Sequence, residues 1–151
     1  MKKLLEIVVA EYQQMTGLNN VSEDTKIVNK HIVPLKKRLC VRHDLLILKS
    51  AKLETIRDFV VAVNEGTVAL GNCITEVLQI VEQIVGCAYS SDDILFHNFE
   101  AEHWCQSRYC LYKEIRKRYG VKFDEQFTDL LTAKDFAKYI FKRINVDKTL
   151  V

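Results

Sequence analysis

The chain has 151 residues, a length that usually forms one compact domain or two very small ones. Its hydrophobic fraction of 48% is ample for a buried core, whereas a net charge of only +2 provides no global field that would draw it to nucleic acids or membranes. With five glycines and one proline, the composition favours long helices over a turn-rich β architecture.

The N-terminal segment has two lysines and a short apolar run, as a signal peptide would. Glu6 and Glu11 interrupt the run and no small-residue cleavage site follows, so we expect a helix over 2–15 instead. No apolar stretch approaches the roughly 20 residues that a bilayer requires. We therefore expect a cytoplasmic protein with no membrane partner, whose five cysteines are reduced thiols.

Helical periodicity dominates the rest of the chain. After the first helix and a polar loop over 18–25, helices are predicted over 29–41, 53–66, 68–86, 100–119 and 132–144. Gly17, Gly66 and Gly86 are expected to end three of the helices. Apart from 67–71 no segment alternates convincingly, so the predicted fold class is all-α.

Two pairs of segments suggest an internal repeat. LETIRDFVVAV at 53–63 and LLTAKDFAKYI at 130–140 share a Leu, a Thr, a basic residue and an Asp-Phe pair. LKKRLCVRHD at 35–44 and IRKRYGVKFD at 115–124 share Lys-Arg, Val and Asp. Each match is short, so the order in which they occur matters more than either one.

The order of these segments is the same in the two halves of the chain. Helices that end at Gly17 and Gly86 precede the matching segments in each half. We therefore predict two helical modules, 1–66 and 67–151. The alternative is two amphipathic helices that are similar by coincidence.

Three segments of the second module follow one another in a recognisable sequence of motifs: CITEVLQIVEQIVG, LYKEIRKRYGVKFDEQF and LLTAKDFAKYI. They give a long helix, a helix that ends in an aromatic residue before a Gly-Val-x-Phe turn, and a closing helix opened by Leu-Thr-x-x-Asp-Phe. In this order they resemble an acyl carrier protein. The resemblance covers nearly all of 73–144 and, more faintly, 3–64. It implies an acyl-carrier-like four-helix bundle, here as two repeated modules packed together.

The closing helix can be derived from its residues alone. Thr132 is expected to cap it, with Asp135 three residues on in the capping-box position. Phe136, Tyr139 and Ile140 then recur at helical spacing and are expected to pack inward.

The resemblance also places the attachment site of the family's phosphopantetheine, a Ser in an Asp-Ser-Leu motif at the start of the second helix. Counted back from Tyr119, this position falls on Cys105, and a thiol cannot replace the hydroxyl. Ser107 is close by and would bind the cofactor only if a phosphopantetheine is carried. We therefore expect no cofactor and no enzyme activity, and a protein-interaction module as the function. The alternative is an atypical carrier modified at Ser107 or another loop Ser.

The second helix of the module departs from the family in its charge, because the family's is acidic and is read by basic enzymes. Here the helix has a basic cluster, in which Glu114 is the one acidic residue. The cluster consists of Lys113, Arg116, Lys117, Arg118 and, just beyond the helix, Lys122. If this surface binds by electrostatics, its partner is expected to be acidic. Trp104 is either a recognition residue for that partner or part of the core. The alternative for the cluster is a solvated helix face.

The sequence gives weaker indications of a metal site, a catalytic site or a nucleic-acid-binding site. Four residues of metal-ligand type, His97, His103, Cys105 and Cys110, fit no standard zinc spacing, and on a helix His103 and Cys105 point about 200° apart. A Cys/His nucleophilic pair would lack an oxyanion-hole motif. A small nucleic-acid-binding protein that uses the basic helix is a further alternative, disfavoured by the near-neutral charge. We predict no metal site.

Overall fold

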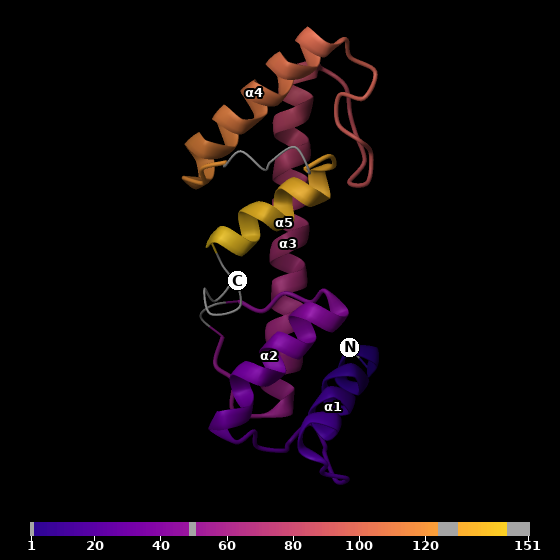
Figure 1. Cartoon of the computed structure of the whole chain (residues 1–151), viewed down its shortest axis with the longest axis vertical. Coiled ribbons are helices and arrows are strands. Elements are labelled where there is room, and N and C mark those ends of the chain that lie inside the picture. The colour runs from indigo at the N-terminus through magenta and orange to yellow at the C-terminus, as the bar shows by residue number, and fades with distance from the viewer. Residues whose placement is uncertain (1, 49–50, 124–129, 145–151) are drawn as a thin grey trace. The chain divides into compact units, whose positions relative to one another are not determined.

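The computed structural model describes residues 2–48, 51–123 and 130–144. In these parts the chain forms five helices and no strand: α1 (Lys2–Thr16), α2 (Asn29–His43), α3 (Ile56–Val85), α4 (Ala101–Tyr119) and α5 (Ala133–Ile144) (Figure 1). The all-α prediction is confirmed. The chain divides into two compact units, of which the first reaches Ala69 and the second covers Leu70–Ile144.

The predicted helix end at Gly66 is wrong, because α3 continues through Gly66 and Gly71 as one helix of 30 residues. Gly66 is buried, and a Cβ atom at this position would lie 2.1 Å from the carbonyl oxygen of Leu46. A single glycine costs a helix only about 1 kcal/mol, so the turns on either side can continue across it. Gly66 therefore permits a close contact between α3 and the backbone at Leu46.

The length and composition of α3 contradict the expectation that no apolar stretch approaches the length of a membrane span. By length and composition alone, α3 could cross a membrane. A single such helix is weak evidence for a span, and 17% of its most apolar 18-residue window is buried. Phe59 and Val63 of α3 are fully buried in the core of the first unit, and Ile80 in that of the second.

The first unit consists of α1, α2 and the first part of α3, with the loops between them (Figure 1). Its fully buried apolar residues include Val8, Leu35, Leu39, Ile56, Phe59 and Val63. Thr55 and Asp58 cap α3: the Asp58 carboxylate accepts the backbone N–H groups of Glu54 at 2.9 Å and Thr55 at 3.0 Å. These bonds satisfy donors that a helix N-terminus leaves without partners.

The buried carboxylate of Glu11 joins α1 to α2 through contacts with three partly exposed side chains within the first unit. The residue is 6% exposed, its Oε1 lies 3.0 Å from Nε2 of His43, and its Oε2 lies 3.3 Å from Nη1 of Arg38 and 3.6 Å from Nη1 of Arg42. Burial alone would raise the pKa of Glu11. The hydrogen bonds to His43 and Arg38 and the charge of Arg42 outweigh burial, so the pKa is lowered from its ordinary value of 4.5.

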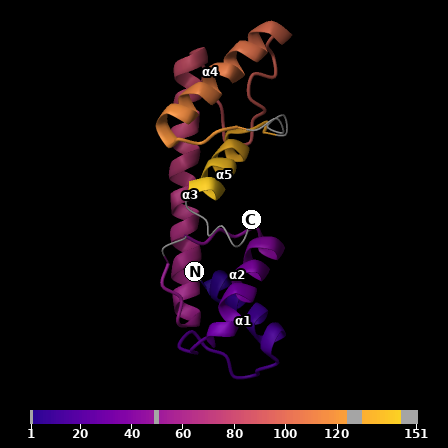
Figure 2. The same ribbon diagram turned by 60° about the vertical axis from the view of Figure 1, so that its left-hand side comes forward.

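The second unit consists of the remainder of α3 with α4 and α5, and the loop over 86–100 joins α3 to α4 (Figure 2). Its fully buried apolar residues include Val77, Ile80, Leu95, Leu111, Ile115 and Phe136. The predicted capping box of α5 is confirmed: the Asp135 carboxylate accepts the backbone N–H of Thr132 at 3.1 Å, and the Asp135 N–H donates to Thr132 Oγ1 at 3.1 Å. Phe136 and Ile140 pack inward as predicted, and Tyr139 is half-buried.

Candidate functional site

The end of α4 places the next residues of the chain against the helix. Gly120 adopts a left-handed conformation with φ of 67°, and its N–H donates to the carbonyl of Arg116. This reversal lets Val121 enter the core, where it is 5% exposed. The Tyr139 hydroxyl of α5 donates to the Lys122 carbonyl at 3.3 Å. The segment over 121–123 is therefore held between α4 and α5.

A groove of about 310 Å³ lies beside α4 and this segment. We call it the basic-aromatic groove; it is lined by Tyr109, Tyr112, Lys113, Arg116, Lys122 and Phe123. Three of these residues are basic and three are aromatic. None of the described residues that line the groove is acidic. The acidic residues Asp124 and Glu125, which follow Phe123 in the sequence, lie outside the described residues.

Aromatic contacts with α5 hold two of the three rings that line the groove. The Phe123 ring stacks on Tyr139 with centroids 5.2 Å apart and lies 4.7 Å from the ring of Tyr112. Tyr112 in turn lies 5.8 Å from Phe136. Burial raises the pKa of the Tyr112 phenol, and the charge of Arg108 offsets part of this rise. These rings form a packed floor for the groove.

Arg108 is 2% exposed and packs against the Tyr112 ring that lines the groove. Its Nη1 donates to the carbonyl of Leu130 at 2.8 Å, and its guanidinium carbon lies 4.6 Å from the Trp104 ring and 5.3 Å from that of Tyr112. A buried guanidinium between aromatic faces is stabilised by cation–π attraction. Trp104 is thus half-buried against Arg108, and it does not line the groove.

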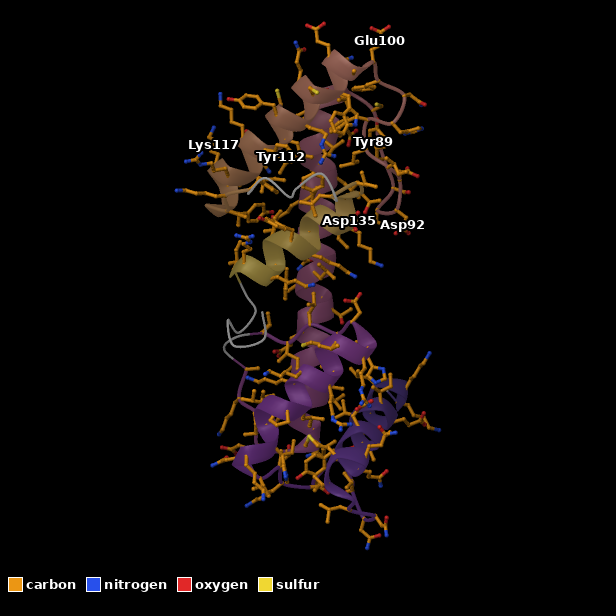
Figure 3. The ribbon with its side chains drawn as sticks, viewed as in Figure 1. Tyr89, Asp92, Glu100, Tyr112, Lys117 and Asp135 are labelled. Carbon is orange, nitrogen blue, oxygen red and sulfur yellow. The ribbon has the colours of Figure 1, made fainter. Side chains whose placement is uncertain are left out.

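The predicted basic cluster divides into three parts. Lys113, Arg116 and Lys122 line the groove. Lys117 is exposed and extends from α4 away from the rest of its unit, whereas Tyr112 lies on the side of α4 that faces α5 (Figure 3). Arg118 donates to Glu114 at 3.3 Å and to Gln83 of α3 at 3.4 Å. Three of the five predicted cations therefore share one site.

Sequence reasoning missed Tyr109, Tyr112 and Phe123, the aromatic half of the groove. Tyr109 is four residues before Lys113, a spacing that puts both side chains on one helix face and could have identified it. Phe123 could not be found in this way, because its place depends on contacts with Tyr112 and Tyr139 from two different helices.

The positions considered for a phosphopantetheine differ in their exposure. Ser107 is 4% exposed and lies on the buried side of α4. Cys105 is exposed in the second turn of the same helix. A hydroxyl inside the core offers no path for a long arm to solvent, and the exposed residue has no hydroxyl.

The histidines and thiols were considered above as metal ligands. Among the residues described, no three His, Cys, Asp or Glu side chains converge as a metal site requires. His97 Nδ1 lies 3.0 Å from the Ile94 carbonyl oxygen, and His103 stacks on Phe99 at 4.4 Å. Burial raises the pKa of the Cys73 thiol to about 11, so this thiol stays protonated near neutral pH.

No family model, no curated protein and no solved structure matches this chain. The acyl-carrier resemblance consequently stays a prediction from sequence segments. The basic-aromatic groove is the described feature whose charge and shape suit the recognition of another molecule.

Proposed function

We propose that this protein is a non-catalytic, acyl-carrier-like helical protein that lacks the phosphopantetheine serine and acts as a protein-interaction module. The observation that carries the proposal is the basic-aromatic groove, where Lys113, Arg116 and Lys122 surround aromatic rings and no described lining residue is acidic. Such a surface attracts an acidic protein and disfavours a basic one.

Corresponding local features in the two units support the proposal of two related modules. Gly17 and Gly86 both have φ near 75°, at 75° and 74°, directly after a helical segment. An isolated bridge joins Lys26 to Thr55 in the first unit, and another joins Ile94 to Thr132 in the second.

The same Thr-x-x-Asp capping contacts follow each of these bridges. In both units the Asp carboxylate accepts the backbone N–H of the Thr, and the Asp N–H donates to the Thr hydroxyl oxygen. These paired features favour a repeat over two coincidentally similar helices. The boundaries 1–66 and 67–151 stay a prediction.

Burial of Ser107 and the thiol at Cys105 favour a module without cargo over an atypical carrier. Co-expression with a phosphopantetheinyl transferase tests this directly. We expect the intact mass to equal that of the unmodified chain. A gain of one phosphopantetheine arm overturns this part of the proposal, and peptide mapping would then locate the modified residue.

Charge reversal of the groove tests the interaction function. We expect the combined change of Lys113, Arg116 and Lys122 to Glu to abolish co-purification of acidic partner proteins, quantified by mass spectrometry. A control variant with Lys3, Lys30 and Lys37 changed to Glu undergoes the same change in net charge at exposed positions of the first unit and should retain the partners. Retention of the same partners by the groove variant would contradict the proposal.

A nucleic-acid-binding protein is the remaining alternative function. It requires oligonucleotide binding that weakens steeply with salt, with a slope that reports several phosphate contacts. We expect no change in the fluorescence anisotropy of a labelled single-stranded or duplex 20-mer at low salt. Tight and salt-sensitive binding would replace the protein-interaction proposal.

A further inference from the structure

The lining of the basic-aromatic groove indicates what it would bind beyond an acidic surface in general. Half of the residues that line it are aromatic. Aromatic rings would not help to bind a ligand that carries only negative charges, because their faces favour apolar groups and cations. Tyr109 is 67% exposed, while Tyr112 and Phe123 are half-buried. A ligand that uses the whole lining therefore needs an apolar group between anionic groups.

The size of the groove limits the ligand to a small part of a partner. Ligand sites span roughly 300–1,000 Å³, and the groove, at about 310 Å³, is at the lower end of this range. One or two side chains fit such a volume. Lys113 and Arg116 come from α4 and Lys122 from the segment after it, so cations flank the rings from two elements.

The ring arrangement favours a peptide over a nucleic acid. Nucleobases bind to single-strand sites by stacking on open aromatic faces, along a track of cations. Phe123 already has Tyr139 stacked on it at 5.2 Å, and the ring of Tyr112 lies tilted beside it at 4.7 Å. Tyr109 presents the most exposed ring of the three that line the groove. Arg118 turns toward Glu114 and Gln83, which interrupts a phosphate track along α4.

We propose that the groove holds a short acidic peptide segment of a partner protein, with one apolar side chain among the rings of Tyr109, Tyr112 and Phe123. Carboxylates on both sides of that side chain pair with Lys113, Arg116 and Lys122. This inference rests on the proposed interaction function and names the partner feature that the site recognises.

Fluorescein-labelled heptapeptides test the inference with the full chain. Each carries Asp or Glu at the six outer positions and Phe, Leu or Ala at the centre. We expect the Phe and Leu peptides to bind about tenfold or more tightly than the Ala peptide, a difference in the range expected for burial of a large apolar side chain. Tyr109→Ala should weaken the Phe peptide and leave the Ala peptide nearly unchanged.

Two charge-reversal variants on the same helix separate the groove from the rest of α4. Lys113→Glu should weaken the Phe peptide about tenfold or more, whereas Lys117→Glu, with an equal change of charge outside the groove, should weaken it less than about threefold. Both side chains are exposed, and circular dichroism checks that each variant is folded.

Four outcomes overturn the inference, and they differ in whether the proposed interaction function survives. Equal affinity for all central residues, with equal effects of the two reversals, leaves a charged interaction surface and removes the groove. If no peptide binds, but co-purification of acidic proteins still requires the groove residues, the inference fails and the proposed interaction function stands. If the protein self-associates and Lys113→Glu abolishes this, the groove binds a second copy of the chain. If an oligonucleotide binds in preference to the peptides, the groove binds nucleic acid.

Discussion

A buried carboxylate in the first unit stays ionised because two arginines and a histidine of one neighbouring helix contact it. Glu11 contacts Arg38, Arg42 and His43, all from α2, and its pKa is lowered despite its burial. A carboxyl whose pKa is lower in the folded than in the unfolded state stabilises the fold at pH values above the unfolded pKa. That contribution is lost as the pH falls through the folded value.

Replacement of Glu11 by Gln should lower the free energy of unfolding by about 1–3 kcal/mol at neutral pH, because it removes charged hydrogen bonds without changing the volume. The difference from the unchanged protein should shrink as the pH falls below 4.5, where the unfolded carboxyl becomes protonated. Urea unfolding at several pH values measures this. Glu6→Gln, at an exposed position of α1, is the control and should change little. A constant difference across the pH range would contradict the prediction.

Arg108 stabilises the second unit through contacts with aromatic rings and with the Leu130 carbonyl. Its replacement by Ala should lower stability by about 2–3 kcal/mol, because it removes a buried cation–π contact and a charged hydrogen bond to Leu130. Arg116→Ala, on the exposed side of the same helix, should change stability by less than about 0.5 kcal/mol. Thermal unfolding compares the two variants. Equal effects would mean that the aromatic contacts of Arg108 contribute nothing.

At the scale of elements, the sequence identified the helices well because apolar periodicity depends on local spacing. It failed at Gly66, because a glycine that permits a close backbone contact looks the same in sequence as one that ends a helix. Half of the site was predicted from the sequence, because its cations occur close together in and just after α4. The position of Phe123 depends on tertiary packing and could not be predicted. Trp104 was recognised as ambiguous, and its contact with Arg108 could not be read from the sequence.

Two glycines of α3 provide a matched test of the close contact. Gly66→Ala should destabilise the protein by about 1–3 kcal/mol, because the new Cβ atom would overlap the Leu46 carbonyl and force the backbone apart. Gly71→Ala meets no atom within 4 Å and should stabilise the helix by about 0.5–1 kcal/mol. Urea unfolding followed by circular dichroism measures both. Stabilisation by both substitutions would mean that α3 and Leu46 are not in close contact.

At the scale of the whole molecule, each unit has its own buried core. Phe59 is fully buried in the first and Phe136 in the second. A core Phe replaced by Ala costs about 3–5 kcal/mol. Phe59→Ala should therefore accelerate hydrogen exchange in α1 and α2 and leave α4 and α5 protected, and Phe136→Ala should do the reverse. Loss of protection throughout the chain in either variant would indicate a single cooperative structure.

The surface thiols have a practical consequence for each of these measurements. Cys87, Cys105 and Cys110 are exposed to solvent, and Cys40 and Cys73 are only partly so. In air, exposed thiolates on separate chains couple through disulfides. A heavier band on a non-reducing gel would then record oxidation during storage, while a complex that survives fresh dithiothreitol records genuine association.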